Sequence, residues 1–228
     1  MKLFLDSASK DDISECQGMV LGVTTNPTLM RRAMVENYES WARDLCANFP
    51  SLPISFEVIT DDHSEMVRQA ELIAAWGDNV FVKIPVVNSQ GDFSGRVIRK
   101  LSKASVKLNV TAITTRDQVK QVVKCLNKKE SAIISIFAGR IADTGVDPIP
   151  TVRFAVKITR PFRGFDVLWA SPRQVLDIAR AEKAGADIIT VSRDILKKLE
   201  LKGKDLTEYS RETSAQFYSD AQLAGYSL

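Results

Sequence analysis

The chain has 228 residues, of which 45% are apolar and 26% are charged, and these proportions are ordinary for one globular domain. A balance of 31 basic against 28 acidic residues, without a known nucleic-acid-binding module around the basic stretches at 124–129 and 153–163, gives no support to nucleic-acid binding. Three widely spaced cysteines, no signal-peptide pattern and no apolar stretch of membrane-spanning length predict a cytoplasmic protein that binds no membrane.

Short apolar runs rich in β-branched residues recur along the whole chain. Runs of this length and composition are typical of strands that are buried on both faces, as in a parallel sheet. In chain order, the predicted strands are 2–6, 19–24, 54–58, 80–84, 106–110, 132–137, 165–170 and 187–191.

The stretches between these runs have helical spacing. Helices are predicted at 64–76, 115–126 and 172–184, the last with Ser171 as N-cap, Pro172 at the first helical position and Gly185 at its end. Eight strands that alternate with helices, without a linker, predict one α/β domain over residues 1–228 that folds as a (β/α)8 TIM barrel. Residues 204–228 are expected to form a C-terminal helical tail packed outside the barrel.

Polar residues follow or end nearly every predicted strand. In a barrel the carboxyl ends of the strands meet at one mouth, where active sites are built. The polar residues at these ends are Asp6, Thr24, Thr25, Asn26, Glu57, Lys83, Asn109, Thr111, Ser135, Arg140 and Ser171. The single histidine, His63, lies in a polar segment at a predicted helix start, so neither a serine-histidine-aspartate triad nor a histidine-rich zinc site is expected.

Lys83 is the most informative of these residues because it lies inside the apolar run VFVKIPV. Burial disfavours the charged form of an amine, and a neutral amine attacks a carbonyl carbon. The alternative is a lysine that protects an edge strand from aggregation. For Asp6 and Glu57, helix capping or pairing with a buried cation is an equally good alternative to catalysis.

Seven segments together resemble one known family. They are LDSA (5–8), GVTTNPTL (22–29), SFEV (55–58), VKIPV (82–86), LNVTAI (108–113), FAGRIADTG (137–145) and WASPR (169–173). In this order they resemble the motifs of the transaldolase family, in its small single-domain subfamily, which also contains fructose-6-phosphate aldolases. The resemblance extends from residue 2 to about residue 199.

The resemblance implies a role for each matching residue. Lys83 would form the Schiff base, Asp6 would assist proton transfer, and Glu57 and Thr111 would hold a catalytic water. The residues implied in substrate binding are Asn26, Asn109, Ser135 and Phe137, and those implied in phosphate binding are Arg140, Ser171 and Arg173. No metal and no cofactor are implied.

The implied reaction is transfer of a dihydroxyacetone unit between sugar phosphates, with sedoheptulose-7-phosphate or fructose-6-phosphate as donor. The alternatives are a lyase of the fructose-6-phosphate aldolase type and a non-catalytic barrel that binds sugar phosphates. Aldolase members tend to carry glutamine and tyrosine where this chain has Glu57 and Phe137, which favours the transferase, although Phe137 could equally be a packing residue.

The resemblance also implies a homo-oligomer. Small members of the family form rings, pentamers or decamers, in which the C-terminal segment covers a neighbouring subunit. The tail of this chain departs from the usual family pattern, as does the long loop at 87–95, and packing of the tail on its own barrel is the alternative.

Overall fold

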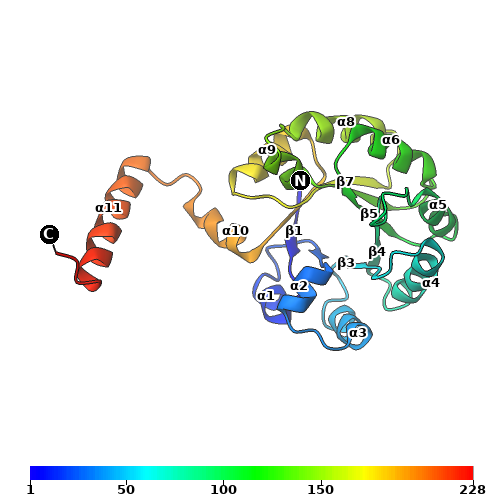
Figure 1. The fold of residues 1–228 in the computed structure, drawn as a ribbon, viewed down its shortest axis with the longest axis horizontal. Coiled ribbons are helices and arrows are strands. Elements are labelled where there is room, and N and C mark those ends of the chain that lie inside the picture. Colours follow the sequence, from blue (N-terminus) through cyan, green and yellow to red (C-terminus); the bar gives the residue numbers. More distant parts are fainter. Residues whose placement is uncertain (228) are drawn as a thin grey trace.

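The computed structural model describes residues 1–227 and shows a closed barrel of eight parallel strands in the order β1 to β8 (Figure 1). The strands are β1 (Lys2–Asp6), β2 (Val23–Thr24), β3 (Ile54–Glu57), β4 (Val80–Pro85), β5 (Leu108–Ile113), β6 (Ala132–Ile136), β7 (Phe165–Trp169) and β8 (Ile188–Val191). The predicted (β/α)8 barrel is therefore confirmed.

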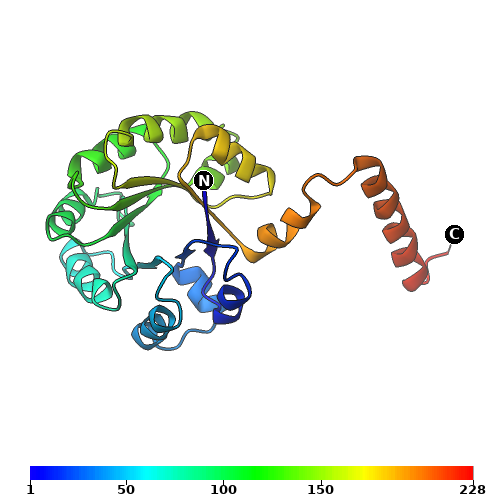
Figure 2. The ribbon, with the colours of Figure 1, turned by 180° about the vertical axis from the view of Figure 1, so that it is seen from behind.

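All helices except the last surround the barrel on its outer side, and two of them follow β2 and two follow β6 (Figure 2). They are α1 (Lys10–Glu15), α2 (Pro27–Arg32), α3 (Tyr38–Asn48), α4 (His63–Ala74), α5 (Gly95–Lys103), α6 (Arg116–Cys125), α7 (Ala138–Asp143), α8 (Ile149–Thr159), α9 (Leu176–Ala184), α10 (Arg193–Lys198), the 3-10 turn η1 (Leu199–Leu201) and α11 (Leu206–Leu223). None of the helices in residues 1–227 is long and apolar enough to cross a membrane.

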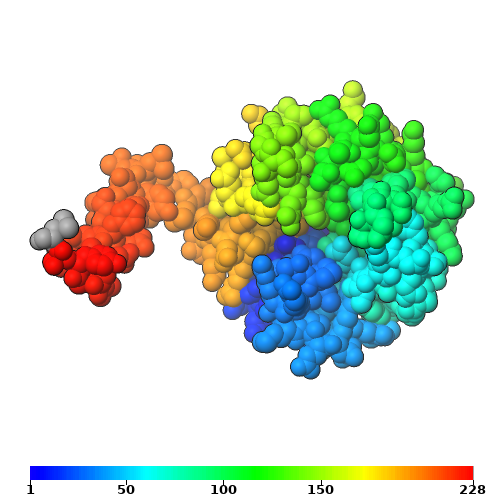
Figure 3. All heavy atoms as spheres, viewed as in Figure 1, coloured from blue at the N-terminus to red at the C-terminus, as the bar shows by residue number. Residues whose placement is uncertain are grey.

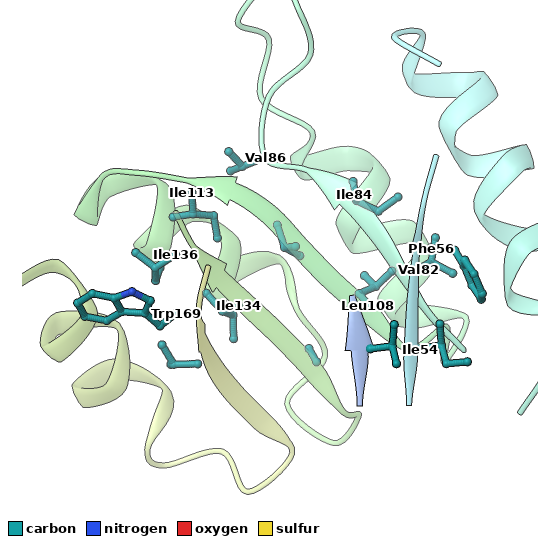
Figure 4. Close-up of a cluster of buried hydrophobic side chains, with 14 of the residues drawn as sticks. Ile54, Phe56, Val82, Ile84, Val86, Leu108, Ile113, Ile134, Ile136 and Trp169 are labelled. Atoms are coloured by element: carbon teal, nitrogen blue, oxygen red, sulfur yellow. The ribbon is translucent and has the colours of Figure 1, made fainter. Parts of the chain in front are cut away.

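The main hydrophobic core lies between the sheet and the helices. Alternate residues of each strand, such as Val82 and Ile84 of β4, point into this core (Figure 4). Because successive side chains of a strand point to opposite faces, Lys83 between them points into the barrel. A smaller apolar cluster, which includes Phe4 and Ile133, lies deeper in the barrel interior. The barrel interior is therefore apolar toward the amino ends of the strands and polar toward their carboxyl ends.

Several predicted boundaries are wrong, and two errors have a clear cause. The predicted strand 19–24 is reduced to Val23–Thr24, and Met19 and Leu21 are both 59% exposed, because the chain turns beneath the barrel before β2 begins. The strand predicted at 106–110 runs instead over Leu108–Ile113 and contains an irregularity between Val110 and Ile113.

The end of the chain also differs from the expectation. The tail is helical, as predicted, but α11 has no buried residue and stands clear of the barrel in Figure 1, Figure 2 and Figure 3. Packing of this helix on the outside of its own barrel is therefore wrong. Its apolar side chains Leu206, Phe217 and Leu223 are 79%, 68% and 85% exposed, so the barrel does not cover them.

Candidate active site

A cavity of about 470 Å³ opens at the carboxyl ends of the strands. This volume suits a small-molecule ligand. All eleven residues predicted for the site line the cavity: Asp6, Asn26, Glu57, Lys83, Asn109, Thr111, Ser135, Phe137, Arg140, Ser171 and Arg173. The structure therefore brings together residues that are up to 167 positions apart, between Asp6 and Arg173.

Lys83 lies on the floor of the cavity, and its side chain is only 7% exposed. Its Nζ donates to the backbone oxygen of Thr25 at 2.6 Å and forms an ion pair with Oε2 of Glu57 at 2.9 Å. These two contacts fix the amine and leave one of its three N–H positions to point elsewhere. A closed barrel has no sheet edge, so protection of an edge strand does not explain this lysine.

Asp6 lies at the end of β1 and accepts a hydrogen bond from the Thr24 hydroxyl at 2.7 Å. The hydroxyls of Thr24 and Thr190 lie 2.6 Å apart, which extends the network to β8. Burial raises the pKa of the Asp6 carboxyl, and the opposing effects of the Lys83 charge and the Thr24 hydrogen bond are smaller. A carboxyl with a raised pKa is suited to proton transfer nearer to neutral pH.

Asn109 is the centre of a second buried network, on β5. Its Nδ2 donates to Ser55 Oγ at 3.1 Å, and its Oδ1 accepts from Ser135 Oγ at 2.6 Å. The amide orientation is thereby fixed, and one N–H of Nδ2 is left for a ligand. Ser135 has its hydroxyl proton committed to Asn109, so it can act toward a ligand as an acceptor.

Glu57 on β3 is in register with Lys83, and Thr111 on β5 is in register with Pro85, two residues after Lys83. The backbone oxygen of Glu57 accepts from the Tyr38 hydroxyl at 2.8 Å, which fixes the end of β3, and burial raises the pKa of Tyr38 so that it remains a donor. Thr111 Oγ1 is buried and has no protein partner among the described residues. The next residue, Ala112, has a φ of 61°, a left-handed conformation at the irregularity of β5.

Asn26 and Phe137 lie where their strands give way to helices. Asn26 is the N-cap of α2, and its Oδ1 accepts from the Leu29 N–H at 3.0 Å, so only its Nδ2 is available to a ligand. Phe137 precedes α7 and is half-buried beside the inner apolar cluster of the barrel. Its position is compatible both with a ligand contact and with packing.

The backbone at Gly139, the residue before Arg140, approaches Ser171 across the ends of β6 and β7. A Cβ on Gly139 would lie 1.6 Å from the backbone oxygen of Ser171, so only glycine permits this approach. Ser171 itself has a φ of 59°, in the left-handed region. The guanidinium of Arg140 is exposed, and no ion pair is formed by it within residues 1–227.

The helix predicted to begin at Pro172 is wrong in its start, because α9 begins at Leu176. Ser171 is therefore not the N-cap of α9, which is Val175. The intervening turn is held instead by Asp177, whose Oδ2 accepts from the N–H of Arg173 at 2.7 Å and of Gln174 at 3.3 Å. The predicted end of this helix is confirmed by Gly185, with a φ of 84°.

Arg173 is not a free cation in the cavity wall. Its Nε donates to Oδ1 of Asp143 at 2.9 Å, and its Nη2 contacts Oδ2 of the same carboxylate. This bidentate hydrogen bond holds the pKa of Asp143 below its usual value. No pattern in the sequence indicates the pair, since the two residues are 30 positions apart.

Other residues at the cavity or behind its lining were missed by the sequence interpretation. Thr190, Thr28 and Arg32 line the cavity, and Ser55 is buried behind the lining, where it accepts a hydrogen bond from Asn109. Ser55 lies two residues before Glu57 on the same strand, so the period of two could have identified it. Within residues 1–227, no three His, Cys, Asp or Glu side chains are grouped so that they could hold a metal ion.

The fold and the cavity define a class of protein: a single-domain barrel with a buried lysine, two carboxylates and a cationic rim at the mouth. The family model described as transaldolase/fructose-6-phosphate aldolase matches residues 3–226. The chain therefore belongs to the transaldolase/fructose-6-phosphate aldolase family, an enzyme family, as the sequence motifs predict.

Relatives in two other organisms have similar sequences. A "probable transaldolase" from Dehalococcoides mccartyi is 35% identical over 203 residues, which cover 87% of this chain and 90% of that protein. A "probable transaldolase" from Methanococcus maripaludis is 33% identical over 202 residues, covering 87% and 89%.

Solved structures with the same fold have much lower sequence identity. One is a 3-hexulose-6-phosphate synthase, with a TM-score of 0.60 and 16% identity over 84% of this chain and 90% of that chain. Another is KGPDC from Streptococcus mutans, with a TM-score of 0.58 and 14% identity over 86% and 89%. At such low identity these structures support the barrel fold alone.

Proposed function

We propose that this enzyme transfers a dihydroxyacetone unit between sugar phosphates through a Schiff base on Lys83. The observation that carries the proposal is the placement of Lys83, which is 7% exposed on the cavity floor and 2.9 Å from the Glu57 carboxylate. Family membership supports the same chemistry. The donor that we propose is sedoheptulose-7-phosphate or fructose-6-phosphate.

Formation of the Schiff base requires the lysine to lose a proton before it attacks. Glu57, in contact with Nζ, is the group placed to accept that proton. The neutral amine adds to the ketose carbonyl, and loss of water gives an iminium. Thr111 Oγ1, buried without a protein partner, and the Glu57 carboxylate would hold the water that leaves here and returns for hydrolysis.

Carbon–carbon cleavage follows at the iminium. The Asp6 carboxylate takes the proton from the C4 hydroxyl, the C3–C4 electron pair moves into the iminium to give an enamine, and an aldose phosphate departs. An acceptor aldehyde then reacts with the enamine carbon, and Asp6 returns the proton to the new hydroxyl. The raised pKa of Asp6 helps it to carry this proton between the two half-reactions.

Arg140, Ser171 and Arg173 are proposed to bind the phosphate. Guanidinium groups match phosphate oxygens, and Gly139 brings Arg140 close to Ser171. Because the guanidinium of Arg173 is paired with Asp143, Arg140 would supply most of the attraction. Asn26 and Asn109, each with an N–H of Nδ2 not used in the networks above, would bind substrate hydroxyls, and the Ser135 hydroxyl would accept from one of them.

Chemical trapping tests the Schiff base directly. Reduction with borohydride in the presence of fructose-6-phosphate should add a ketose-derived mass to the peptide that contains Lys83. Lys83→Arg should abolish both labelling and turnover, because a guanidinium stays protonated and cannot attack. Lys2→Arg is the matched control, since Lys2 is also a strand lysine but is ion-paired with Asp166 at the amino end of β1, far from the cavity. Labelling at a different lysine would contradict the proposal.

We expect Phe137 to favour the transferase reaction over the lyase reaction of the fructose-6-phosphate aldolase type. It lines the cavity but has no hydroxyl that could position a water or a proton beside the enamine. We therefore expect transfer to an aldehyde to be faster than release of dihydroxyacetone, and Phe137→Tyr to shift the ratio toward release. The ratio is measured by assaying dihydroxyacetone with and without an acceptor. Rapid release by the unmodified enzyme would favour the lyase, and an unchanged ratio in Phe137→Tyr would make Phe137 a packing residue.

A further inference from the structure

The rim of the cavity carries one more cation than the phosphate site described above. Arg32, Arg140 and Arg173 all line the cavity. Arg173 is balanced by the bidentate contact with Asp143. Arg32 is exposed and, like Arg140, forms no ion pair within the described part of the chain. Two guanidiniums that form no ion pair within residues 1–227 therefore line the same cavity.

Arg32 and Arg140 lie on opposite sides of the mouth. Arg32 ends α2, which follows β2, whereas Arg140 is in α7, which follows β6. In a closed ring of eight strands, β2 and β6 are four strands apart and thus diametrically opposed. A ligand whose first anionic group is bound by Arg140 would need a second anionic group to form an ion pair with Arg32.

The orientation of α2 selects Arg32 and not its neighbour. Thr28 and Arg32 are one helical turn apart, so they share one side of α2, and both line the cavity. Arg31 is also exposed but does not line the cavity. An alternative role for Arg32 is to stabilise the helix dipole at the end of α2. This role would apply equally to Arg31, because both arginines lie in the last turn. It therefore does not explain why only Arg32 lines the cavity.

Neither carboxylate on the floor forms an ion pair with Arg32. Glu57 is paired with Lys83, and Asp6 accepts a hydrogen bond from the Thr24 hydroxyl. A phosphate group carries about −1.5 to −2 charges at pH 7, which one free arginine and the hydroxyl of Ser171 can bind at the β6–β7 side. The positive charge on the β2 side is then left for a different anionic group.

We propose that Arg32 and Thr28 form a second anion subsite, and that the sugars preferred by this cavity carry two anionic groups. One is the phosphate at Arg140, and the other is a phosphate or a carboxylate at Arg32. The inference rests on the function proposed above, in that it takes the cavity to bind sugar phosphates.

Binding of inert sugar analogues tests the subsite without turnover. Calorimetry would compare a hexitol monophosphate, a hexitol bisphosphate and an aldonic acid phosphate, none of which has a carbonyl that can react with Lys83. Both doubly anionic ligands, or one of them, should bind about tenfold or more tightly than the monophosphate, as expected for an added charge-assisted contact. The ligand that gains identifies the second anion as phosphate or carboxylate.

Two single variants assign the gain to Arg32. In Arg32→Gln the preference for the doubly anionic ligand should fall to about twofold or less, while the monophosphate binds as before. In Arg31→Gln, which removes the same charge one position away, the preference should remain. Thermal melting of both variants checks that the fold is intact.

Three results would overturn the subsite. The first is equal affinity for singly and doubly anionic ligands in the unmodified protein. The second is an equal loss of preference in both variants, which would indicate general surface charge. The third is weaker monophosphate binding in Arg32→Gln, which would place Arg32 at the first phosphate. Trapping at Lys83 is measured separately, so failure of the subsite and failure of the Schiff-base mechanism are distinguishable.

Discussion

Asp6 shows how one buried carboxyl can couple proton transfer to stability. Burial raises its pKa in the folded protein, against the smaller effects of Lys83 and Thr24. In the unfolded chain the carboxyl ionises at about pH 4. Between that pH and the raised pKa, the folded protein holds a proton that the unfolded chain has released. Stability is therefore lost as the pH rises through this window.

Asp6→Asn should remove this dependence, because an amide stays neutral and its oxygen can still accept from the Thr24 hydroxyl. We expect the stability of the variant relative to the unmodified protein to increase as the pH rises above about 4. Turnover should fall by about 10²- to 10⁴-fold through loss of proton transfer. Urea unfolding from pH 4 to pH 8 measures the first effect. Asp11→Asn, at an exposed position of α1, is the control, and a stability difference that does not vary with pH would contradict the argument.

At the scale of the elements, the contact between the β6–α7 turn and the end of β7 shapes the proposed phosphate site. Gly139→Ala would place a Cβ 1.6 Å from the Ser171 oxygen, so the two segments must separate. We expect a loss of stability of about 1–3 kcal/mol or more, together with a raised KM for phosphorylated substrates. Thermal unfolding and steady-state kinetics measure the two effects.

Gly145→Ala is the control for this substitution. Gly145 has a φ of 81° but has nothing within 4 Å of an added Cβ, so the variant should lose about 1–2 kcal/mol to backbone strain and keep its KM. If Gly139→Ala behaves like Gly145→Ala in both measurements, the close approach does not position the site.

The apolar pattern predicted the eight strands, but it did not predict how the strands end or the second helices after β2 and β6. Eight runs of apolar residues identify eight strands because burial on both faces demands them. The left-handed residues Ala112 and Ser171 are not glycines, so nothing in their sequence marks the irregularity of β5 or the late start of α9. The site residues were predictable because polar side chains stand out in apolar strands, whereas pairs such as Arg173 with Asp143 depend on the assembled barrel.

At the scale of the whole molecule, α11 stands out because no other part of the chain buries its surface. It has 18 residues, about 27 Å of helix, and none of them is buried. Leu206, Tyr209 and Phe217 fall within one sector of about 80° on a helical wheel of about 100° per residue. Exposed apolar side chains aligned on one side of a helix are typical of a surface that is covered by a partner.

We predict that α11 packs on a second copy of this chain in a ring-shaped oligomer, as the resemblance to small transaldolases implies. Light scattering should then give five or ten times the chain mass of 25.3 kDa. Phe217→Ser should lower the measured mass, because it places a hydroxyl in the apolar sector. Tyr218→Ser should not, because Tyr218 lies about 100° further round the helix although its exposure of 69% is close to the 68% of Phe217. A monomer at micromolar concentration would show that α11 has no such partner, and equal effects of the two substitutions would show that the sector containing Phe217 is not the contact.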